Sequence, residues 1–188
     1  MPLEGSQIVL REQREDDLPF FAEMRNNLET QAWSLTLPPD YTLPMFEKQF
    51  REQEFSFKRD SGRFIIEEKS SGEMVGMVSY SHGEPRFSTM LGIMTRKKFW
   101  GKGYAYEAQE IILKFLFEEL GLRVVKLYTH SGNPKAVKLA ERSGFKLSCR
   151  QREAVFKNGQ LFDNLLLDLL REEYYQIHPE LTDNLPKL

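Results

Sequence analysis

A short basic segment with two glycines one residue apart is the part of this chain best suited to bind a charged ligand. The segment 96–104 reads Arg-Lys-Lys-Phe-Trp-Gly-Lys-Gly-Tyr, so Arg96, Lys98 and Lys102 lie close to the glycine pair. A strand-like apolar run precedes it, and apolar residues then recur at helical spacing from Tyr104 onward. The free N–H groups and the dipole of a helix N-terminus attract anions, and glycine lets a phosphate approach the backbone closely. The segment therefore predicts a site for a phosphorylated ligand, in particular a pyrophosphate.

Two better-known phosphate-binding loops do not match this segment. The P-loop requires Ser or Thr after its lysine, but Lys102 is followed by Gly103. The dinucleotide-binding fingerprint requires a third glycine and an early βαβ unit, and the sequence has neither. A glycine pair alone also fits a tight turn that merely begins a helix, so a second motif is needed to choose between the two interpretations.

The second motif lies downstream, where residues 133–145 read Asn-Pro-Lys-Ala-Val-Lys-Leu-Ala-Glu-Arg-Ser-Gly-Phe. With the glycine segment and the order of elements, it resembles the GNAT superfamily of acetyl-CoA-dependent N-acetyltransferases over nearly the whole chain. The glycine segment, the Asn158-Gly159 turn with Asp163, and the closing Leu-Leu-Arg-Glu-Glu-Tyr are most similar to the branch that contains ribosomal-protein N-terminal acetyltransferases. The resemblance implies an enzyme that uses acetyl-CoA as acetyl donor, acts on an amine acceptor and needs no metal.

The resemblance also implies which residues hold the coenzyme. The strand before the glycine segment would splay from its neighbour, and its backbone would pair with the pantetheine arm through Ile93, Met94 and Thr95. The backbone amides that would hold the pyrophosphate belong to Gly101, Lys102, Gly103, Tyr104 and Ala105. Asn133 would hydrogen-bond the coenzyme arm, and Lys135 or Lys138 would meet the adenosine phosphates. Lys98 stands where the family usually has Gln or Arg, so it supplies charge without the planar, bidentate geometry of arginine.

Both side chains that usually carry acid–base chemistry in this family are replaced here. Met90 occupies the position of the usual glutamate base, and Ala140 that of the usual tyrosine acid. Four other residues are candidates for these roles: His82, Tyr128, His130 and Ser131. Tyr128 and His130 end the strand that is expected to splay, so either could face the thioester. His82 has a suitable intrinsic pKa but is favoured as a solvated turn residue, and Tyr128 is favoured as a packed side chain. Ser131 fits a proton donor or a loop cap equally well.

The missing base favours an acceptor amine of low pKa. A lysine side chain, with a pKa of about 10.4, is neutral in fewer than roughly one in a thousand molecules near pH 7. An α-amine, with a pKa of about 7.7–8.0, is neutral in roughly a tenth or more. The predicted reaction is therefore direct acetyl transfer to a protein or peptide N-terminus. A small-molecule amine (an amino sugar, an antibiotic or a polyamine) is the alternative, and a non-catalytic coenzyme A-binding module is the third reading.

Four further residues are weaker candidates for contacts with the acceptor. Trp33 and Tyr41 fit either an acceptor pocket or a hydrophobic cover over the core. Glu84 fits a turn equally well. Asp163 lies opposite Ala154 if Asn158-Gly159 forms a two-residue turn, with Arg152 diagonal on the same face. A surface ion pair is favoured there over a substrate anchor.

The rest of the chain supplies the elements that position these residues. Strand alternation, helical periodicity and turn residues predict the order β-α-α-β-β-β-α-β-α-β-β, which is an α/β domain around a mixed sheet. The predicted strands span 7–12, 63–68, 73–81, 87–95, 123–130, 145–156 and 160–170. The predicted helices span about 17–29, 44–55, 103–121 and 133–143, with a further helical turn within 169–175. The Asn158-Gly159 pair predicts a β-hairpin.

Length and composition limit the alternatives. The 188 residues, 40% hydrophobic and 29% charged, predict one globular domain over 1–188, with a loose tail over 175–188. A net charge of −2 gives no basic field for nucleic acid or an anionic membrane. The lone Cys149 cannot form an internal disulfide and the first residues resemble no signal segment, so a cytoplasmic protein is expected. Final hairpins of such folds can pair between protomers, which makes a homodimer one expected state.

Overall fold

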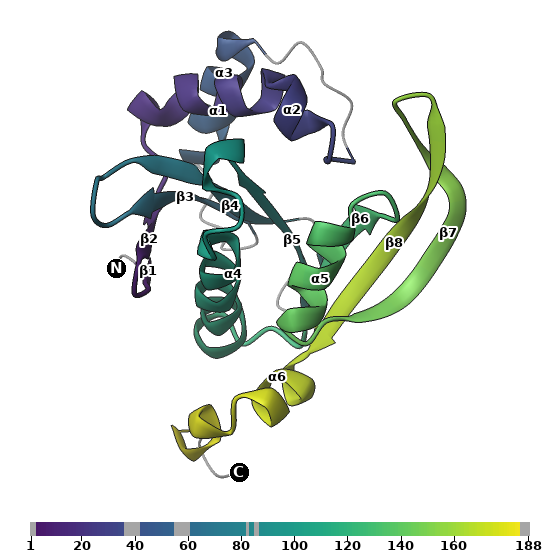
Figure 1. Cartoon of the computed structure of the whole chain (residues 1–188). Coiled ribbons are helices and arrows are strands. Elements are labelled where there is room, and N and C mark those ends of the chain that lie inside the picture. Colours follow the sequence, from purple (N-terminus) through teal and green to yellow (C-terminus); the bar gives the residue numbers. More distant parts are fainter. Residues whose placement is uncertain (1–2, 36–41, 55–60, 82, 85–86, 185–188) are drawn as a thin grey trace.

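The chain folds around one mixed β-sheet (Figure 1). The computed structural model describes residues 3–35, 42–54, 61–81, 83–84 and 87–184. The sheet has eight strands in the order β1-β2-β3-β4-β5-β6-β8-β7, and β5 and β6 run parallel while the other neighbouring strands are antiparallel. The strands, in chain order, are β1 (Leu3–Glu4), β2 (Ile8–Glu12), β3 (Gly62–Glu68), β4 (Met74–Ser81), β5 (Ser88–Thr95), β6 (Val124–His130), β7 (Lys146–Lys157) and β8 (Gln160–Leu170).

Helices cover both faces of this sheet, so two apolar layers form. Helices α1 and α3 pack on one face, and α4, α5 and α6 contribute to the layer on the other. In Figure 1, α1–α3 lie at the top and α4 and α5 lie in front of the sheet. The helical segments are η1 (Glu15–Asp17), α1 (Leu18–Asn26), α2 (Leu28–Gln31), α3 (Leu43–Glu54), η2 (Lys97–Phe99), α4 (Tyr104–Lys114), η3 (Phe115–Glu119), α5 (Pro134–Arg142), α6 (Arg171–Ile177) and η4 (Pro179–Asn184).

The strand alternation explains how one sheet serves two cores. Ile65 and Met77 are buried under α1 and α3, whereas their chain neighbours Ile66 and Val78 are buried on the α4 side. Successive side chains of a strand point to opposite faces, so an apolar run such as this is stable only when both faces are covered. The α/β fold with a mixed sheet is therefore confirmed.

One predicted helix is broken in two. Periodicity predicted a helix over about 17–29, but the backbone is extended at Asn27, with φ −74° and ψ 109°. The Asn27 side chain accepts a hydrogen bond from the backbone N–H of Thr30 at 3.0 Å and so caps a new helix, α2. Asparagine favours such a local bond over continued helix. The extended backbone at Asn27 therefore separates α1 from α2.

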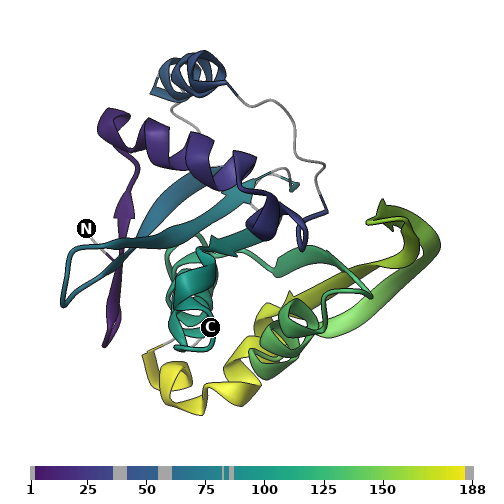
Figure 2. The ribbon, with the colours of Figure 1, turned by 45° about the horizontal axis from the view of Figure 1, so that its top comes forward.

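The last two strands form a long hairpin that extends beyond the sheet (Figure 2). Asn158 and Gly159 have φ values of 50° and 76°, and Lys157 pairs with Gln160 across them, which confirms the predicted two-residue turn. The register of β7 shifts between Gln151 and Val155, where an irregularity adds residues to β7. Such irregularities bend a strand and increase its twist. The tip of the hairpin consequently reaches α2.

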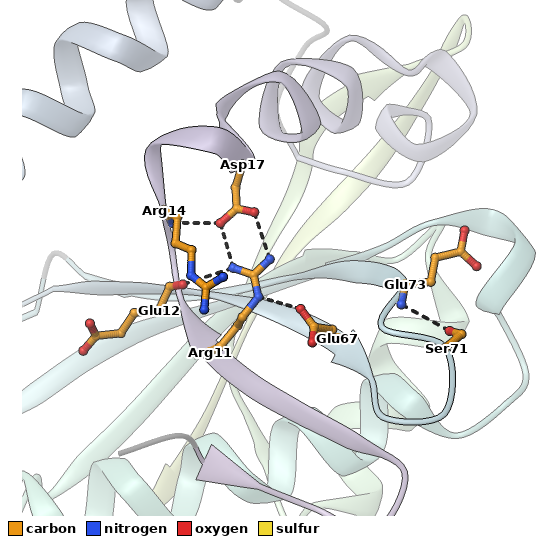
Figure 3. Close-up of polar contacts among 7 residues, drawn as sticks. All are labelled: Arg11, Glu12, Arg14, Asp17, Glu67, Ser71 and Glu73. Carbon is orange, nitrogen blue, oxygen red and sulfur yellow. Dashed lines mark hydrogen bonds and ion pairs between the residues drawn. The ribbon is translucent and has the colours of Figure 1, made fainter.

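A partly buried ion-pair network fixes the turn between β2 and α1 against the sheet (Figure 3). Arg11 on β2 donates two hydrogen bonds to the carboxylate of Asp17, at 2.8 and 2.9 Å, and a third to Glu67 on β3 at 2.6 Å. The backbone N–H of Arg14 donates to Asp17 as well, at 2.8 Å. Asp17 is only 4% exposed. The network therefore sets the angle at which the chain leaves β2 and enters α1.

The Asp17 carboxylate makes stability depend on pH. Burial acts to raise the pKa of Asp17, but the hydrogen bonds from Arg11 and Arg14 outweigh burial and lower that pKa below its ordinary value. A carboxyl group whose pKa is lower in the folded chain stabilises the fold fully at pH values above its unfolded pKa of about 3.9. This stabilisation is lost as the pH falls through the pKa of the folded chain. We expect the Tm difference between the wild type and Asp17→Asn to shrink on acidification below about pH 4. Thermal melts between pH 2 and 7 measure it, and a constant difference would contradict the assignment.

The C-terminal segment packs on η3, which directly follows α4. Tyr174 of α6 is 2% exposed and its ring lies 4.8 Å from that of Phe117. The predicted loose tail over 175–188 contains the end of α6 and η4, and its looseness and the single-domain boundary stay predictions. No helix within the described ranges has both the length and the apolar character needed to span a membrane.

Candidate functional site

The candidate site begins where β5 and β6 separate. These parallel strands pair at three positions, the last of which joins Met90 to Lys126. Beyond that pair β5 continues to Thr95 beside β4, and β6 continues to His130 beside β8. The two facing strand edges, 91–95 and 127–130, are therefore not paired with each other, and we call them the open β5–β6 edge. The structure places the predicted residues Ile93, Met94 and Thr95 on it.

The glycine segment follows directly at the end of β5. Gly101 and Gly103 have φ values of 79° and 89°, in the left-handed region that favours glycine. A Cβ built on either residue would meet no protein atom within 4 Å. The first hydrogen bond of α4 is donated by Glu107 N to Gly103 O, so the amides of Tyr104 and Ala105 point out of the helix end. The end of β5, the two glycines and the free amides at the start of α4 together form a cradle that fits an anion.

The cations around this cradle are held by neighbouring side chains. Lys98 forms an ion pair with Glu73, and Lys102 lies over the Phe99 ring at 5.1 Å. Lys135, at the start of α5, lies 4.9 Å from the centre of the Trp100 ring and so brings a second helix to the cradle. Arg96 instead turns away. Its guanidinium pairs with Glu23 of α1 at 2.8 Å and lies over Phe20 at 4.6 Å, so it serves the α1 layer.

Tyr104 anchors the first turn of α4 to the sheet. Its hydroxyl donates a hydrogen bond to Glu68 at the end of β3, and the Tyr104 side chain is buried. That hydrogen bond is the main cause that raises the pKa of Tyr104, while hydrogen bonds from Ser71 and Tyr104 lower the pKa of Glu68. Because the side chain is fixed, the free amides above it keep a constant direction.

Asn133 connects the start of α5 to the end of the α2 region. Its Oδ1 accepts from the backbone N–H of Ala136 at 3.2 Å, which caps α5. Its Nδ2 donates to the carbonyl oxygen of Trp33 at 3.0 Å. Asn133 therefore holds together two segments that lie far apart in sequence, and its predicted contact with the coenzyme stays a prediction.

The catalytic candidates divide by position. Met90 pairs with Lys126, and side chains alternate along strands, so Met94, Tyr128 and His130 lie on the same face as Met90, the face that carries α1. Tyr128 is 43% exposed and His130 is 2% exposed. Ala140, at the position of the usual tyrosine, is fully buried in the opposite layer. The face that carries α1 therefore holds Met94, Tyr128 and His130 beside the open β5–β6 edge.

The remaining candidates either have hydrogen-bond partners within their own loop or turn, or lie outside the residues that the structure describes. Ser131 Oγ accepts from the backbone N–H of Asp163 at 3.0 Å, as in the loop-cap reading. The backbone N–H of Glu84 donates to Ser88 Oγ at 3.3 Å, and its side chain is exposed, as in the turn reading. His82 and Tyr41 lie outside the described residues, so their roles stay predictions.

Asp163 differs from its predicted partner. The hairpin turn placed Ala154 opposite Asp163 and Arg152 diagonal to it, but the Asp163 carboxylate instead pairs with Arg150 and accepts from the backbone N–H of Glu153. The shift of register in β7 moves the partner by two residues, and Glu153 takes a φ of 53° within the shift. The contacts lower the pKa of Asp163, chiefly through the Glu153 amide and then Arg150.

A cluster of residues at the hairpin tip was not found from the sequence. Lys157, the last residue of β7, is 7% exposed, and its Nζ donates to the carbonyl oxygen of Gln31 at 3.0 Å. The Gln31 side chain in turn lies 3.8 Å from the sulfur of Met94 on the open β5–β6 edge. Trp33, at 42% exposed, lies next to this cluster through its carbonyl bond to Asn133. The sole sequence signal was the Asn-Gly turn beside Lys157, which gives no indication of α2 as its neighbour.

Comparisons with known proteins agree with this geometry. The chain is 26% identical to a spermidine N(1)-acetyltransferase from Vibrio cholerae over 90% of this chain and 96% of that protein. It is also 26% identical to a putative ribosomal N-acetyltransferase from Bacillus subtilis, over 89% of this chain and 84% of that protein. A solved structure of the Vibrio cholerae spermidine N-acetyltransferase with CoA and spermine superposes with a TM-score of 0.82 at 25% identity, covering 90% of this chain and 99% of that chain.

The family assignment follows from a match at the level of the domain. The model of the acetyltransferase (GNAT) domain matches residues 7–146, which include β2, the open β5–β6 edge, the glycine cradle and Asn133. The superfamily predicted from the two motifs is therefore confirmed, whereas the branch of ribosomal-protein acetyltransferases stays a prediction. This chain belongs to the GNAT family of N-acetyltransferases.

Proposed function

We propose that this enzyme transfers the acetyl group of acetyl-CoA directly to the α-amine of a peptide or protein N-terminus. The observation that carries the proposal is the open β5–β6 edge that leads into the glycine cradle. The cradle fits the pyrophosphate of the donor, because its amides are free and no Cβ blocks them. The unpaired edge of β5 fits the amide groups of the pantetheine arm, which need backbone partners.

The acceptor is proposed on the basis of proton affinity. With Met90 in the place of the usual base, the enzyme has no carboxylate at that position to deprotonate a strongly basic amine. Deprotonation at pH 7 costs about 4–5 kcal/mol for a lysine-like amine with a pKa of about 10.4, but only about 1 kcal/mol for an α-amine with a pKa of about 7.7–8.0. An enzyme without this carboxylate base is therefore better suited to the α-amine. Its catalysis would come from positioning of the two substrates and from a backbone N–H that polarises the thioester carbonyl.

The charges near α1 and α2 support the same acceptor. Glu23 of α1 pairs with Arg96 at 2.8 Å, and Glu29 of α2 pairs with Lys97 at 2.7 Å. Both carboxylates thus already have a cationic partner in the segment after β5. A polyamine carries several ammonium groups, and each needs a carboxylate as partner. A peptide N-terminus carries a single ammonium group.

The acetyl group can pass directly from the thioester to the amine, with all bonds and protons accounted for and without a covalent enzyme intermediate. The acceptor ammonium loses one proton to solvent, and the neutral amine attacks the thioester carbon, so a C–N bond forms and the carbonyl electrons move to oxygen. When the carbonyl re-forms, the C–S bond breaks and the thiolate leaves with its electron pair. The second amine proton then passes to the thiolate, which becomes the thiol of CoA. We assign this last proton relay to Tyr128, since this residue is 43% exposed on the face proposed for the acceptor and carries a hydroxyl.

A polyamine is the second candidate acceptor. It is favoured by one observation, the likeness to the spermidine N-acetyltransferase of Vibrio cholerae, which was solved with CoA and spermine.

Thiol release from acetyl-CoA tests the proposal against these alternatives. With a panel of short peptides, spermidine and an amino sugar at pH 7.5, we expect kcat/KM for peptides with free N-termini to exceed that for spermidine by at least about tenfold. Mass spectrometry locates the acetyl group on the α-amine. Preference for spermidine would select the polyamine reading, and tight coenzyme binding without turnover of any amine would select a binding module.

A further inference from the structure

Two neighbouring residues at the tip of the β7–β8 hairpin have the reverse of the usual burial. Phe156 is 64% exposed, whereas Lys157, the next residue of β7, is buried. Within β7, all of which the structure describes, Lys157 is the one buried residue. Lysine is rarely buried in a fold, and such ordinary preferences are most often broken where a residue serves function. The buried ammonium of Lys157 therefore calls for an explanation.

The hairpin turn selects this arrangement over its obvious alternative. Asn158 and Gly159 form a two-residue turn, across which Lys157 pairs with Gln160. A slip of the register by one residue would turn Phe156 inward and Lys157 outward, as the two residue types ordinarily prefer. The observed register keeps the lysine inward even though burial lowers the pKa of its ammonium. The contacts of that ammonium therefore decide what it does.

The ammonium holds the end of α2. Lys157 Nζ donates a hydrogen bond to the carbonyl oxygen of Gln31, the last residue of α2, at 3.0 Å. The same oxygen accepts from the backbone N–H of Ser34 at 3.1 Å. Two residues beyond Gln31, the carbonyl oxygen of Trp33 accepts from Asn133 at 3.0 Å. The backbone that follows α2 is thus held from two sides, by the hairpin tip and by the start of α5.

Gln31 connects this contact to the open β5–β6 edge. Its side chain is buried, and its Nε2 donates to the carbonyl oxygen of Met24 in α1 at 3.3 Å. The same nitrogen lies 3.8 Å from the sulfur of Met94, which is on the face that carries α1. Lys157 therefore acts on the open β5–β6 edge through α2, and no ligand has to reach its ammonium.

We propose that Lys157 is a positioning residue for the acceptor amine, because its ammonium holds the end of α2, and with it Trp33, beside the open β5–β6 edge. This inference rests on the proposed function and on binding of the acceptor at the face that carries α1. The donor site does not depend on this contact, since β5 is held by its pairing with β4 and the cradle follows it directly in the chain. Loss of the ammonium should therefore impair the use of the acceptor and spare that of acetyl-CoA.

The first test is Lys157→Met, which removes the charge and keeps most of the side-chain volume. We expect kcat/KM for the peptide that the wild type acetylates best to fall about tenfold to a hundredfold, mainly through KM, because the acceptor is held less precisely. The KM for acetyl-CoA and the calorimetric affinity for CoA should stay within about twofold of wild type. Lys146→Met is the matched control. It makes the same change at the other end of β7, where the lysine pairs with Glu173, and should leave both substrates unaffected.

Stability separates positioning from packing. Lys157→Met removes the cost of burying a charge, and the Gln31 carbonyl keeps the Ser34 N–H as a partner. The Tm of Lys157→Met should therefore not fall, although the acceptor kinetics worsen. Thermal melts monitored by circular dichroism measure it beside Lys146→Met.

Chemical rescue tests the ammonium itself. Cys149 is the single cysteine of the chain, so Lys157→Cys in a Cys149→Ser background gives one thiol to modify. Alkylation with bromoethylamine in urea, followed by refolding, places an ammonium on a side chain of nearly the length of lysine. We expect this treatment to restore kcat/KM for the peptide to within about threefold of the Cys149→Ser parent carried through the same refolding.

The outcomes distinguish a failure of this inference from a failure of the proposed function. If Lys157→Met weakens both substrates equally, or neither, the positioning role is overturned, and equal losses with a lower Tm assign Lys157 to packing. Alkylation that restores nothing overturns the role of the ammonium. A wild type that prefers spermidine contradicts the proposed acceptor, and the same comparison with spermidine then decides the role of Lys157. If the wild type acetylates no amine, the proposed function fails and the positioning role fails with it.

Discussion

Gly103→Val should raise the KM for acetyl-CoA by about a hundredfold, equivalent to about 2.7 kcal/mol of binding. Gly103 has a φ of 89° and open space where a Cβ would stand, directly before the free amides of α4. A β-branched side chain there both strains the backbone and occupies the space in which the pyrophosphate would approach the amides. Steady-state kinetics with acetyl-CoA as the varied substrate, together with calorimetric CoA binding, measure the loss.

Gly72→Val is the matched control for this substitution. Gly72 lies in the turn between β3 and β4 with a φ of 69°, and a Cβ there also meets no atom within 4 Å. Both variants therefore carry a similar backbone strain, of order 1–3 kcal/mol. We expect both to lose stability, but only Gly103→Val to lose affinity for the coenzyme. Equal effects on KM would show that strain alone, and not the cradle, accounts for the result.

Arg11→Met should destabilise the fold by about 3–5 kcal/mol. The Arg11 side chain is 16% exposed, and its guanidinium bridges Asp17 and Glu67 with three hydrogen bonds (Figure 3). Its removal leaves two carboxylates close together and without their cation, and one of them is buried. Methionine keeps most of the side-chain volume, so the loss reports charge and hydrogen bonding more than packing. Urea unfolding monitored by circular dichroism gives the difference in the free energy of unfolding.

Two further variants identify the origin of that loss. Arg51→Met makes the same change on the exposed surface of α3 and should alter stability by less than about 0.5 kcal/mol. Arg11→Met combined with Asp17→Asn should recover part of the lost stability, because the uncompensated buried charge is then absent. If the double variant is no more stable than Arg11→Met alone, the network stabilises the fold through packing and not through charge.

The cradle is the feature for which local sequence was sufficient. A glycine is needed wherever the backbone takes a left-handed φ, and a helix start follows from periodicity, so Gly101, Gly103 and the beginning of α4 were predictable. The Asn158-Gly159 hairpin was predictable for the same reason, since its turn type depends on two adjacent residues. Asn133 was recognised through its motif, and the structure adds that both ends of its amide are used within the chain.

Local sequence was insufficient where a neighbour from another element decides the geometry. The prediction for Asp163 failed because a shift of register inside β7 exchanged its partner, and such shifts leave no clear pattern in composition. The break at Asn27 was missed because periodicity continues across it, although the capping side chain ends the helix. Arg96 was grouped with the cradle by its place in the sequence, but Glu23 on α1 draws it to the other layer.

The sequence by itself indicated the glycine cradle proposed for the acetyl donor, and the tertiary structure decided what surrounds the side proposed for the acceptor. The donor site is built from consecutive residues, 91–105, whose conformations follow from glycine, strand and helix preferences within one stretch of chain. The side proposed for the acceptor joins α2, the end of β6 and the tip of the β7–β8 hairpin. These segments meet through the contact of Lys157 with Gln31 and the contact of Asn133 with Trp33. His130 and Asn164 face each other through strand register, which depends on long-range pairing and cannot be read from either segment alone.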